Sequence, residues 1–357
     1  MNQEPHIRTR RNVKKKKSKN VIIFLVFLIF FLVVFLIGIF IGSTPDILSK
    51  YSLKQTNSFV EESIPSDNEN LATTNEVDSV KTEEEKIAEA EVEKMSELKD
   101  EFIETFSTLY PSVKLSFLIK NLDTNAMVVH NDCKMNSASL IKLFILETVY
   151  NKVTEGEYIL SEERDNNLSI MITRSDNKAA NAFIDDFGGQ NENRKVEDTN
   201  EINKFIKSKG YKYTELNRKM YDVTPPGGPT GYQNYTSVGD VCTFLEGIYK
   251  KTALQEPFNT STLSLLKKQE RRGKIPAKIV EKYSDVLVAN KTGELAQVEN
   301  DAAIIMGDDF NLIFVVMTDD IPKKSDGNTD YALKERVQNT IADFGVHLVE
   351  LYKQKKF

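Results

Sequence analysis

The sequence predicts an α+β fold in which an antiparallel sheet is flanked by the terminal helices and accompanied by a separate helical lobe. The first observation is the order of patterns: a helical pattern, two β-rich runs, a helical block, three β-rich runs and a last helical pattern. The second is length. The expected domain, residues 81–357 with a core at about 100–350, is long enough to bury a substantial interior.

The first 42 residues predict a membrane anchor. Residues 1–20 hold eight basic side chains against one acidic one, and residues 21–42, VIIFLVFLIFFLVVFLIGIFIG, hold no charged or polar side chain. A helix of this length crosses roughly 30 Å of hydrocarbon. The run is longer than the apolar region of a signal peptide and lacks its cleavage site, so we expect an uncleaved helix. The basic residues predict a cytoplasmic tail, a single pass through the cell membrane and an extracellular domain.

The rest of the chain is acidic. The formal net charge is −6 in spite of the basic tail, so the external part lacks the basic signature of nucleic-acid binding. Residues 43–80 are rich in Ser, Thr, Asn, Asp and Glu and show no sustained apolar period. This composition predicts an acidic, flexible spacer between the membrane and the domain.

An amphipathic helix and a hairpin open the domain. The apolar residues of the helix recur at close to helical spacing, and they are Val92, Met95, Phe102, Phe106 and Leu109. The helix is expected to end before Pro111. Residues 113–122 and 126–131 are β-rich and flank the turn-forming DTN, which predicts a hairpin.

The same kinds of pattern predict the helices, loop and strands in the middle and at the end of the domain. Helices are expected at about 139–153, 161–173, 177–187, 200–208 and 236–251, the last one capped by Thr236 or Ser237. Residues 223–235, VTPPGGPTGYQNY, predict a loop, because Pro and Gly dominate them. Strands are expected at 285–295, 301–309 and 310–320, and a closing helix at about 331–353.

Cysteine and histidine usage narrows the chemistry. Cys133 and Cys242 are the only cysteines, and either one bridge or two free buried thiols fits an exported domain. No CxxC or Cys/His cluster is present, so neither a metal nor another cofactor is expected. The three histidines are His6, His130 and His347. No G-x-S-x-G elbow accompanies them, so a Ser-His-Asp triad is not indicated.

A serine and a lysine offer a different nucleophile. In SASLIKLFIL, residues 137–146, Ser139 stands at the expected start of a helix and Lys142 follows three residues later. On a helix this spacing puts the two side chains on one face, with Cβ atoms about 5–6 Å apart. Ser139 is either an ordinary N-cap or a serine that a neutral lysine activates, at a helix N-terminus that suits a developing oxyanion.

Two further motifs decide in favour of the nucleophile. Ser175-Asp176-Asn177 opens a predicted helix, and Lys291-Thr292-Gly293 lies on a predicted strand. The order S-x-x-K, S-D-N, K-T-G resembles the penicillin-recognising serine hydrolases, namely class A β-lactamases and penicillin-binding proteins. The resemblance covers roughly residues 100–350 and includes RRGKIPAKI before the K-T-G strand. A second S-D-N at 66–68 lies in the spacer with no helix after it and is rejected.

The resemblance implies roles for the first two motifs. Ser139 would be the acylated nucleophile and Lys142 its proton acceptor. Ser175 would relay a proton to the leaving nitrogen. Asn177 would hold the substrate amide or Lys142. The fold implied is that of the β-lactamases and transpeptidases.

The third motif would bind the substrate. By the same resemblance, Lys291 and Thr292 of the K-T-G segment would hold the substrate carboxylate, with Gly293 completing the motif. The backbone N–H groups of Ser139 and Glu294 would form the oxyanion hole. Two neighbouring lysines beside serine hydroxyls suit an anionic acyl donor, and each lysine helps to lower the pKa of the other. The partner implied is a small β-lactam or a peptide of peptidoglycan.

The sequence departs from the class A pattern at three points. The position of the loop glutamate that deacylates the class A enzymes falls near Met220, and Glu215 and Asp222 are the nearest acids. The segment between Lys142 and Ser175 is shorter than in typical class A enzymes. Glu294 places a carboxylate beside a site for anions, although alternate strand residues face opposite sides.

Three functions follow from these observations. The first is a membrane-anchored serine hydrolase of the class A β-lactamase type that is acylated at Ser139 and hydrolyses a β-lactam or a related amide. The second is a penicillin-binding, D,D-peptidase-like enzyme that acts on cell-wall peptides. The third is a catalytically silent surface binding domain.

Overall fold

The structure, a computed structural model, describes residues 83–188, 196–197, 200–221 and 232–354. These residues belong to one compact unit that spans Asp78–Phe357. The predicted tail, anchor and spacer, at 1–20, 21–42 and 43–80, lie outside the described residues, as does most of the predicted loop at 223–235. None of the described helices is both long and apolar enough to cross a membrane.

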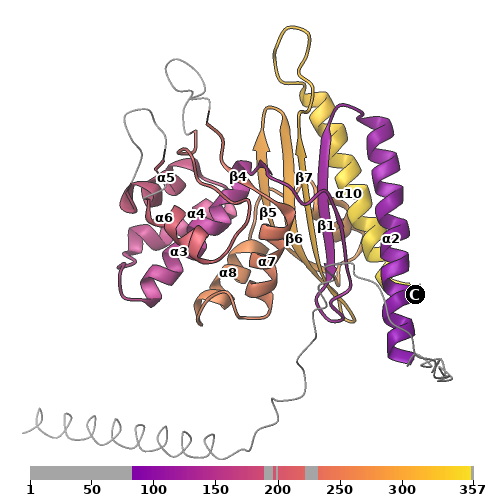
Figure 1. The fold of residues 1–357 in the computed structure, drawn as a ribbon, viewed down its shortest axis with the longest axis horizontal. Helices are drawn as coiled ribbons and strands as arrows, with labels where there is room; N and C mark the ends of the chain where they lie inside the picture. Colours follow the sequence, from indigo (N-terminus) through magenta and orange to yellow (C-terminus); the bar gives the residue numbers. More distant parts are fainter. Residues whose placement is uncertain (1–82, 189–195, 198–199, 222–231, 355–357) are drawn as a thin grey trace, which may run out of the picture. The chain divides into compact units, whose positions relative to one another are not determined.

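An antiparallel sheet of five strands forms the middle of the domain, with the order β2-β1-β7-β6-β5 (Figure 1). Its strands are β1 (Lys114–Asn121), β2 (Met127–His130), β5 (Leu287–Leu295), β6 (Val298–Met306) and β7 (Asn311–Asp319). The central strands β6 and β7 are buried along almost their whole length, because helices cover both faces of the sheet. The predicted α+β fold with an antiparallel sheet is confirmed.

Helices from both ends of the domain cover one face of the sheet (Figure 1). They are α2 (Glu83–Leu109) and α10 (Tyr331–Lys353), joined there by α9 (Ile275–Lys282). Phe102 of α2 stacks on Phe344 of α10 with ring centroids 4.0 Å apart. The apolar stripe predicted for α2 is wrong at its two margins, because Val92 and Leu109 are 39% and 55% exposed while the residues between them face the core.

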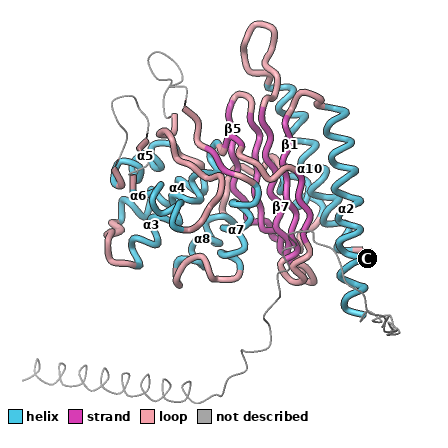
Figure 2. The backbone as a smooth tube through the Cα atoms, in the orientation of Figure 1, coloured by secondary structure: helices cyan, strands magenta, loops and turns pink. Residues whose placement is uncertain are grey.

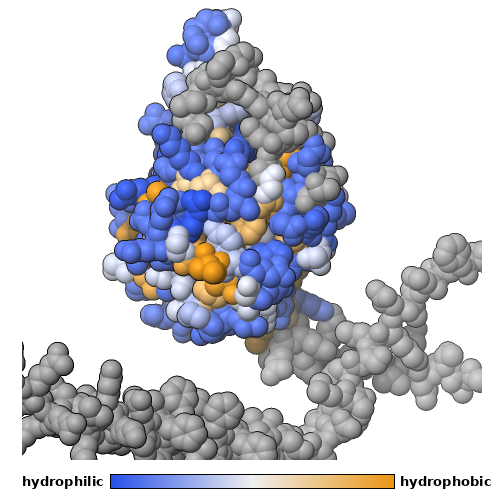
Figure 3. Space-filling model, turned by 90° about the vertical axis from the view of Figure 1, so that its left-hand side faces the viewer, coloured by the Kyte–Doolittle hydropathy of each residue, from blue (hydrophilic) through white to orange (hydrophobic). Residues whose placement is uncertain are grey.

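The helical lobe packs on the other face of the sheet (Figure 2). Its helices are α3 (Ile141–Thr154), α4 (Glu162–Thr173), α5 (Asn177–Asp186), α6 (Glu201–Ser208), α7 (Val238–Tyr249) and α8 (Phe258–Lys267). The α3 helix is almost entirely buried and forms the centre of the lobe. The outer surface of the lobe is mainly hydrophilic, with scattered apolar spots (Figure 3).

Several predicted elements differ from the structure. Ser139 lies in a short 3-10 turn, η1 (Ala138–Leu140), and the α-helix begins after it at Ile141. The strand predicted from 301 begins at Val298, because a tight turn after β5 starts the pairing earlier. The short helices α8 and α9 and the two-stranded pair β3 (Met135–Asn136) and β4 (Tyr235–Thr236) were not predicted, because so few residues show no clear period.

The cysteines and one predicted cap are resolved by the structure. Cys133 is exposed and Cys242 is buried, and both are free. The predicted disulfide bridge is therefore wrong, and so is the prediction that both thiols are buried.

Ser237 caps α7 by accepting a hydrogen bond from the N–H of Asp240, which selects Ser237 over Thr236.

Candidate active site

Ser139 is presented by a strained turn that the sheet supports. Ala138, just before it, has a φ of +46°, a conformation that is costly for a residue with a side chain. The side-chain amide of Asn300 on β6 donates to the carbonyl oxygen of Ser137 at 3.3 Å. Gly293 of β5 lies so close that an added Cβ would stand 2.8 Å from the same carbonyl oxygen. The glycine of the K-T-G motif therefore lets the strand approach the nucleophile turn.

A change at Gly293 tests this close approach. We expect Gly293→Ala to lower the free energy of unfolding by about 1–3 kcal/mol through overpacking and to slow acylation of Ser139 by displacing its turn. Urea unfolding and adduct formation would measure both effects. Gly273→Ala is the matched control, because its added Cβ would meet only one atom, at 3.9 Å. Equal stability of the two variants would contradict the argument.

Lys142 is fully buried at the first turn of α3 and points at Ser139. Its Nζ lies 3.1 Å from Ser139 Oγ, 2.7 Å from the carbonyl oxygen of Ser175 and 2.7 Å from Oδ1 of Asn177. Burial lowers the pKa of Lys142 to about 7. A neutral amine can donate to the two closer oxygens and accept the hydroxyl proton of Ser139, which is the arrangement a general base requires.

Ser175 connects this lysine to a second one. Its Oγ accepts hydrogen bonds from Nζ of Lys291 at 2.9 Å and from Nζ of Lys142 at 3.3 Å. The backbone of Ser175 is held in the left-handed region, with a φ of +61°. Asp176 then caps α5 by accepting from the N–H of Ala179 at 2.8 Å, so the S-D-N sequence both turns the chain and starts the helix.

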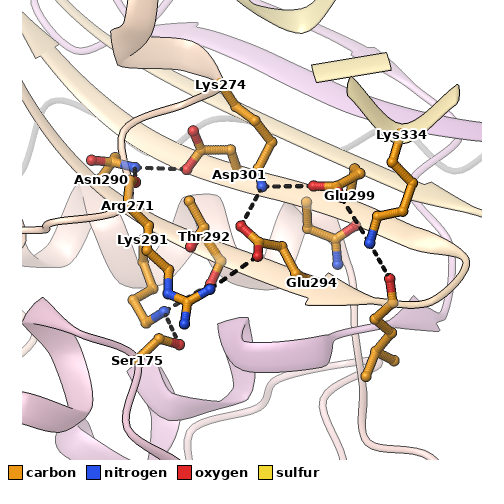
Figure 4. Close-up of polar contacts among 12 residues, drawn as sticks. Ser175, Arg271, Lys274, Asn290, Lys291, Thr292, Glu294, Glu299, Asp301 and Lys334 are labelled. Carbon is orange, nitrogen blue, oxygen red and sulfur yellow. Dashed lines mark hydrogen bonds and ion pairs between the residues drawn. The ribbon is translucent and has the colours of Figure 1, made fainter. Parts of the chain in front are cut away.

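Lys291 is also completely buried, and its side chain points at Ser175 (Figure 4). Its Nζ donates to Ser175 Oγ and to the carbonyl oxygen of Thr292 at 2.7 Å. Burial first, and then repulsion by Lys142, hold the pKa of Lys291 well below its usual value. The structure thus brings the serines and lysines of all three motifs into hydrogen-bonding contact, although they come from three separate parts of the chain.

Two asparagines of α5 form hydrogen bonds to the backbone of Met220 and Tyr221, which line the pocket. Asn177 accepts from Lys142 through Oδ1 and donates through Nδ2 to the carbonyl oxygen of Tyr221. Asn181, one helical turn later, bonds both the N–H and the carbonyl oxygen of Met220, at 2.7 Å and 2.9 Å. The Met220 side chain is buried and carries no acid, so it offers no base for deacylation.

Of the two acids nearest to Met220, Glu215 and Asp222, the structure describes only Glu215. Glu215 accepts hydrogen bonds from Lys134 at 2.7 Å and from Asn217 at 3.2 Å, so its carboxylate binds loop residues. Asp222 lies outside the described residues. Of the described residues that line the pocket around Ser139, Glu294 is the sole carboxylate. No described group of His, Cys, Asp and Glu side chains is arranged to hold a metal ion.

The Glu294 side chain takes part in a set of charges that sequence reasoning missed (Figure 4). Its carboxylate accepts from Lys274 at 2.9 Å and from Arg271 at 3.1 Å. Lys274 also donates to Glu299 at 2.8 Å. Arg271 and Lys274 belong to the RRGKIPAKI segment, which the sequence marks only through its resemblance to known enzymes. The backbone oxyanion hole at Ser139 and Glu294 stays a prediction, as does carboxylate binding by Thr292.

Comparisons with known proteins agree with this geometry. A family model described as "Beta-lactamase enzyme family" matches residues 97–167 and 165–346. No curated protein matches the chain. A β-lactamase from Sphaerobacter thermophilus is 20% identical with a TM-score of 0.57, covering 70% of this chain and 97% of its own. A β-lactamase from Xanthomonas campestris is 18% identical with a TM-score of 0.57, covering 72% and 98%.

A third structural neighbour carries a name other than β-lactamase. PBP-A is 22% identical with a TM-score of 0.55, covering 69% of this chain and 95% of its own. Identities this low carry the fold alone, whereas the family model spans more than half of the chain. The resemblance found in the sequence is therefore confirmed, and the chain belongs to the β-lactamase enzyme family.

Proposed function

We propose that the protein is a serine hydrolase that is acylated at Ser139 by a β-lactam or a related amide and then hydrolyses the acyl-enzyme. The observation that carries the proposal is the 3.1 Å approach of the buried Lys142 Nζ to Ser139 Oγ. A lysine with a pKa of about 7 is neutral in a large fraction of molecules at neutral pH. It can accept the serine proton without help from a histidine.

The chemical steps follow from the contacts. Lys142 takes the hydroxyl proton of Ser139 while Oγ attacks the amide carbonyl, and the tetrahedral oxyanion forms. The C–N bond then breaks, and the leaving nitrogen receives a proton that passes from Lys142 through the hydroxyl of Ser175. Lys291, 2.9 Å from that hydroxyl, orients it. Water later attacks the ester carbonyl, its hydroxyl stays on the released acid, and its other proton goes to Oγ of Ser139.

A second function is favoured by the pocket lining. The described lining holds no carboxylate except Glu294, and that group is bound to Lys274 and Arg271. Class A β-lactamases deacylate with a loop glutamate acting through water. Without such a base the acyl-enzyme persists, which is the behaviour of a penicillin-binding enzyme that acts on cell-wall peptides. One structural neighbour is a PBP-A mutant solved as an acyl-enzyme complex with penicillin G.

One experiment separates these functions. The full-length protein and Ser139→Ala are mixed with penicillin G, and intact protein mass and free drug are followed over time. We expect an adduct on the wild type alone. Its rapid loss with drug consumption identifies a β-lactamase, and its persistence identifies a penicillin-binding enzyme. No adduct and no loss of drug would refute the acylation and leave a silent binding domain.

We also propose that residues 21–42 anchor the protein in the cell membrane with the domain outside. The apolar run and the basic residues before it support this topology. Deleting residues 21–42 is expected to move the protein from the membrane to the soluble fraction. Deleting the equally long stretch 44–65 of the spacer should leave it in the membrane. Protease added to intact cells should remove the domain, and its full protection would contradict the topology.

A further inference from the structure

Two glutamates face each other across the end of the sheet. Glu294 of β5 and Glu299 of β6 are direct cross-strand partners. Like charges in this position repel each other unless a cation lies between them. Lys274 supplies that cation, because its Nζ donates to Glu294 at 2.9 Å and to Glu299 at 2.8 Å (Figure 4). We call these three residues, with Arg271 and Lys334, the charge cluster.

The inner part of the charge cluster is balanced without any substrate. Lys274 and Glu299 are almost completely buried, and Lys334 lies 2.9 Å from Glu299. Burial alone would lower the pKa of Lys274, but Glu299 and Glu294 raise it on balance. Lys274 therefore stays charged and paired with the carboxylates, which a buried ion requires. These side chains support the strand turn and are closed to a ligand.

The outer part of the charge cluster, Glu294 and Arg271, extends to the pocket of Ser139. Glu294 lines the same pocket as Ser139. Its second oxygen binds Arg271, whose side chain is 53% exposed. The guanidinium also donates to the carbonyl oxygen of Arg174, next to Ser175, at 3.3 Å. Arg271 lowers the pKa of both Lys142 and Lys291, after larger contributions from burial, so its charge is felt at the reacting groups. Arg271 is therefore an exposed cation at the rim of the site, and its guanidinium is already paired with the carboxylate of Glu294.

We propose that Glu294 is a specificity-determining residue that stands in for a substrate carboxylate on Arg271. The site therefore favours acyl donors that are neutral beside the scissile amide, such as amidated or esterified ones, over donors with a free carboxylate. Donors with a free carboxylate still acylate Ser139, but their acylation is slower than that of the corresponding neutral donors. The inference deepens the proposed function and rests on it, because it concerns the same acylation step.

The test compares a charged and a neutral form of one donor. Full-length wild type and Glu294→Gln are acylated with penicillin G and with its methyl ester, and the two rate constants are measured by intact mass. We expect Glu294→Gln to raise the ratio of the carboxylate rate to the ester rate by about tenfold, because a negative charge is lost beside the site. The amide of glutamine keeps the size of the side chain, and Lys274 keeps Glu299 as its partner.

Two variants control the result. Glu270→Gln removes the same charge from an exposed glutamate that pairs with Arg174, and it is expected to leave the ratio within about twofold of wild type, since exposed charges are screened. Arg271→Gln, at an exposed position, is expected to lower the ratio, because Glu294 then loses a neutralising partner. Thermal melting confirms that each variant is folded.

The outcomes are distinct. Adducts on every protein with an unchanged ratio in Glu294→Gln, or in Arg271→Gln, would overturn the role of Glu294 and leave the proposed function standing. An equal rise in Glu270→Gln would also overturn it, because general charge would explain the change. No adduct from either compound on any protein would refute the proposed function, and the inference would fall with it.

Discussion

Replacing Lys142 with alanine is expected to lower the rate constant for acylation of Ser139 by about 10²–10⁴-fold. The reason is the geometry around its amine: Nζ is buried and lies 3.1 Å from Ser139 Oγ. A serine hydroxyl is a weak nucleophile until a base removes its proton. The rate of adduct formation with penicillin G, followed by intact mass, measures the effect directly.

A lysine from the same helix provides the control. Lys152 of α3 forms an ion pair with Glu157 at 2.5 Å, away from the lining of the pocket. Lys152→Ala is expected to acylate within about twofold of wild type, since surface ion pairs contribute little. Acylation of Lys142→Ala at the wild-type rate, with the adduct on Ser139, would show that another group removes the proton.

Replacing Lys274 with methionine is expected to lower the free energy of unfolding by about 3 kcal/mol, the cost typical of breaking a buried ion pair. Lys274 stands between Glu294 and Glu299, which are cross-strand partners, and its loss leaves two carboxylates facing each other. Removing one partner from a buried ion pair is costly, and here Glu299 would keep only Lys334 and Glu294 would keep only Arg271 as a counter-ion. Urea denaturation followed by circular dichroism measures the change.

The matched control lies one turn further along the chain. Lys278 of α9 pairs with Asp343 of α10, and their side chains are 39% and 56% exposed. Lys278→Met is expected to change the free energy of unfolding by less than about 1 kcal/mol. If the two variants were equally stable, the ions of the charge cluster would contribute no more than a surface pair.

The local part of the site follows from the sequence. A spacing of three residues places Ser139 and Lys142 together once a helix begins there, and the N-cap preference of Asp176 marks the start of α5. The contact of Ser175 with Lys291 joins residues far apart in the chain. Resemblance to a known family predicted that contact, and no local pattern would have done so.

The charge cluster is the part that could not be predicted. It depends on the strand register that pairs Glu294 with Glu299, and a shift of one residue would turn one of them to the other face of the sheet. It also depends on Lys274, which precedes the short helix α9. In the sequence these residues resemble an ordinary solvated surface. The burial of Lys274 and Glu299 shows only when α9 and the sheet are packed together.

The central claim, that a buried and neutral Lys142 activates Ser139, is tested most directly by the pH dependence of acylation. Burial lowers the pKa of Lys142 to about 7, so the amine is protonated below that pH and cannot accept the serine proton. The rate constant for adduct formation with penicillin G should therefore rise with pH, with a midpoint at about 7, and level off above it. A rate constant that stays flat between about pH 5 and 9 would contradict the account.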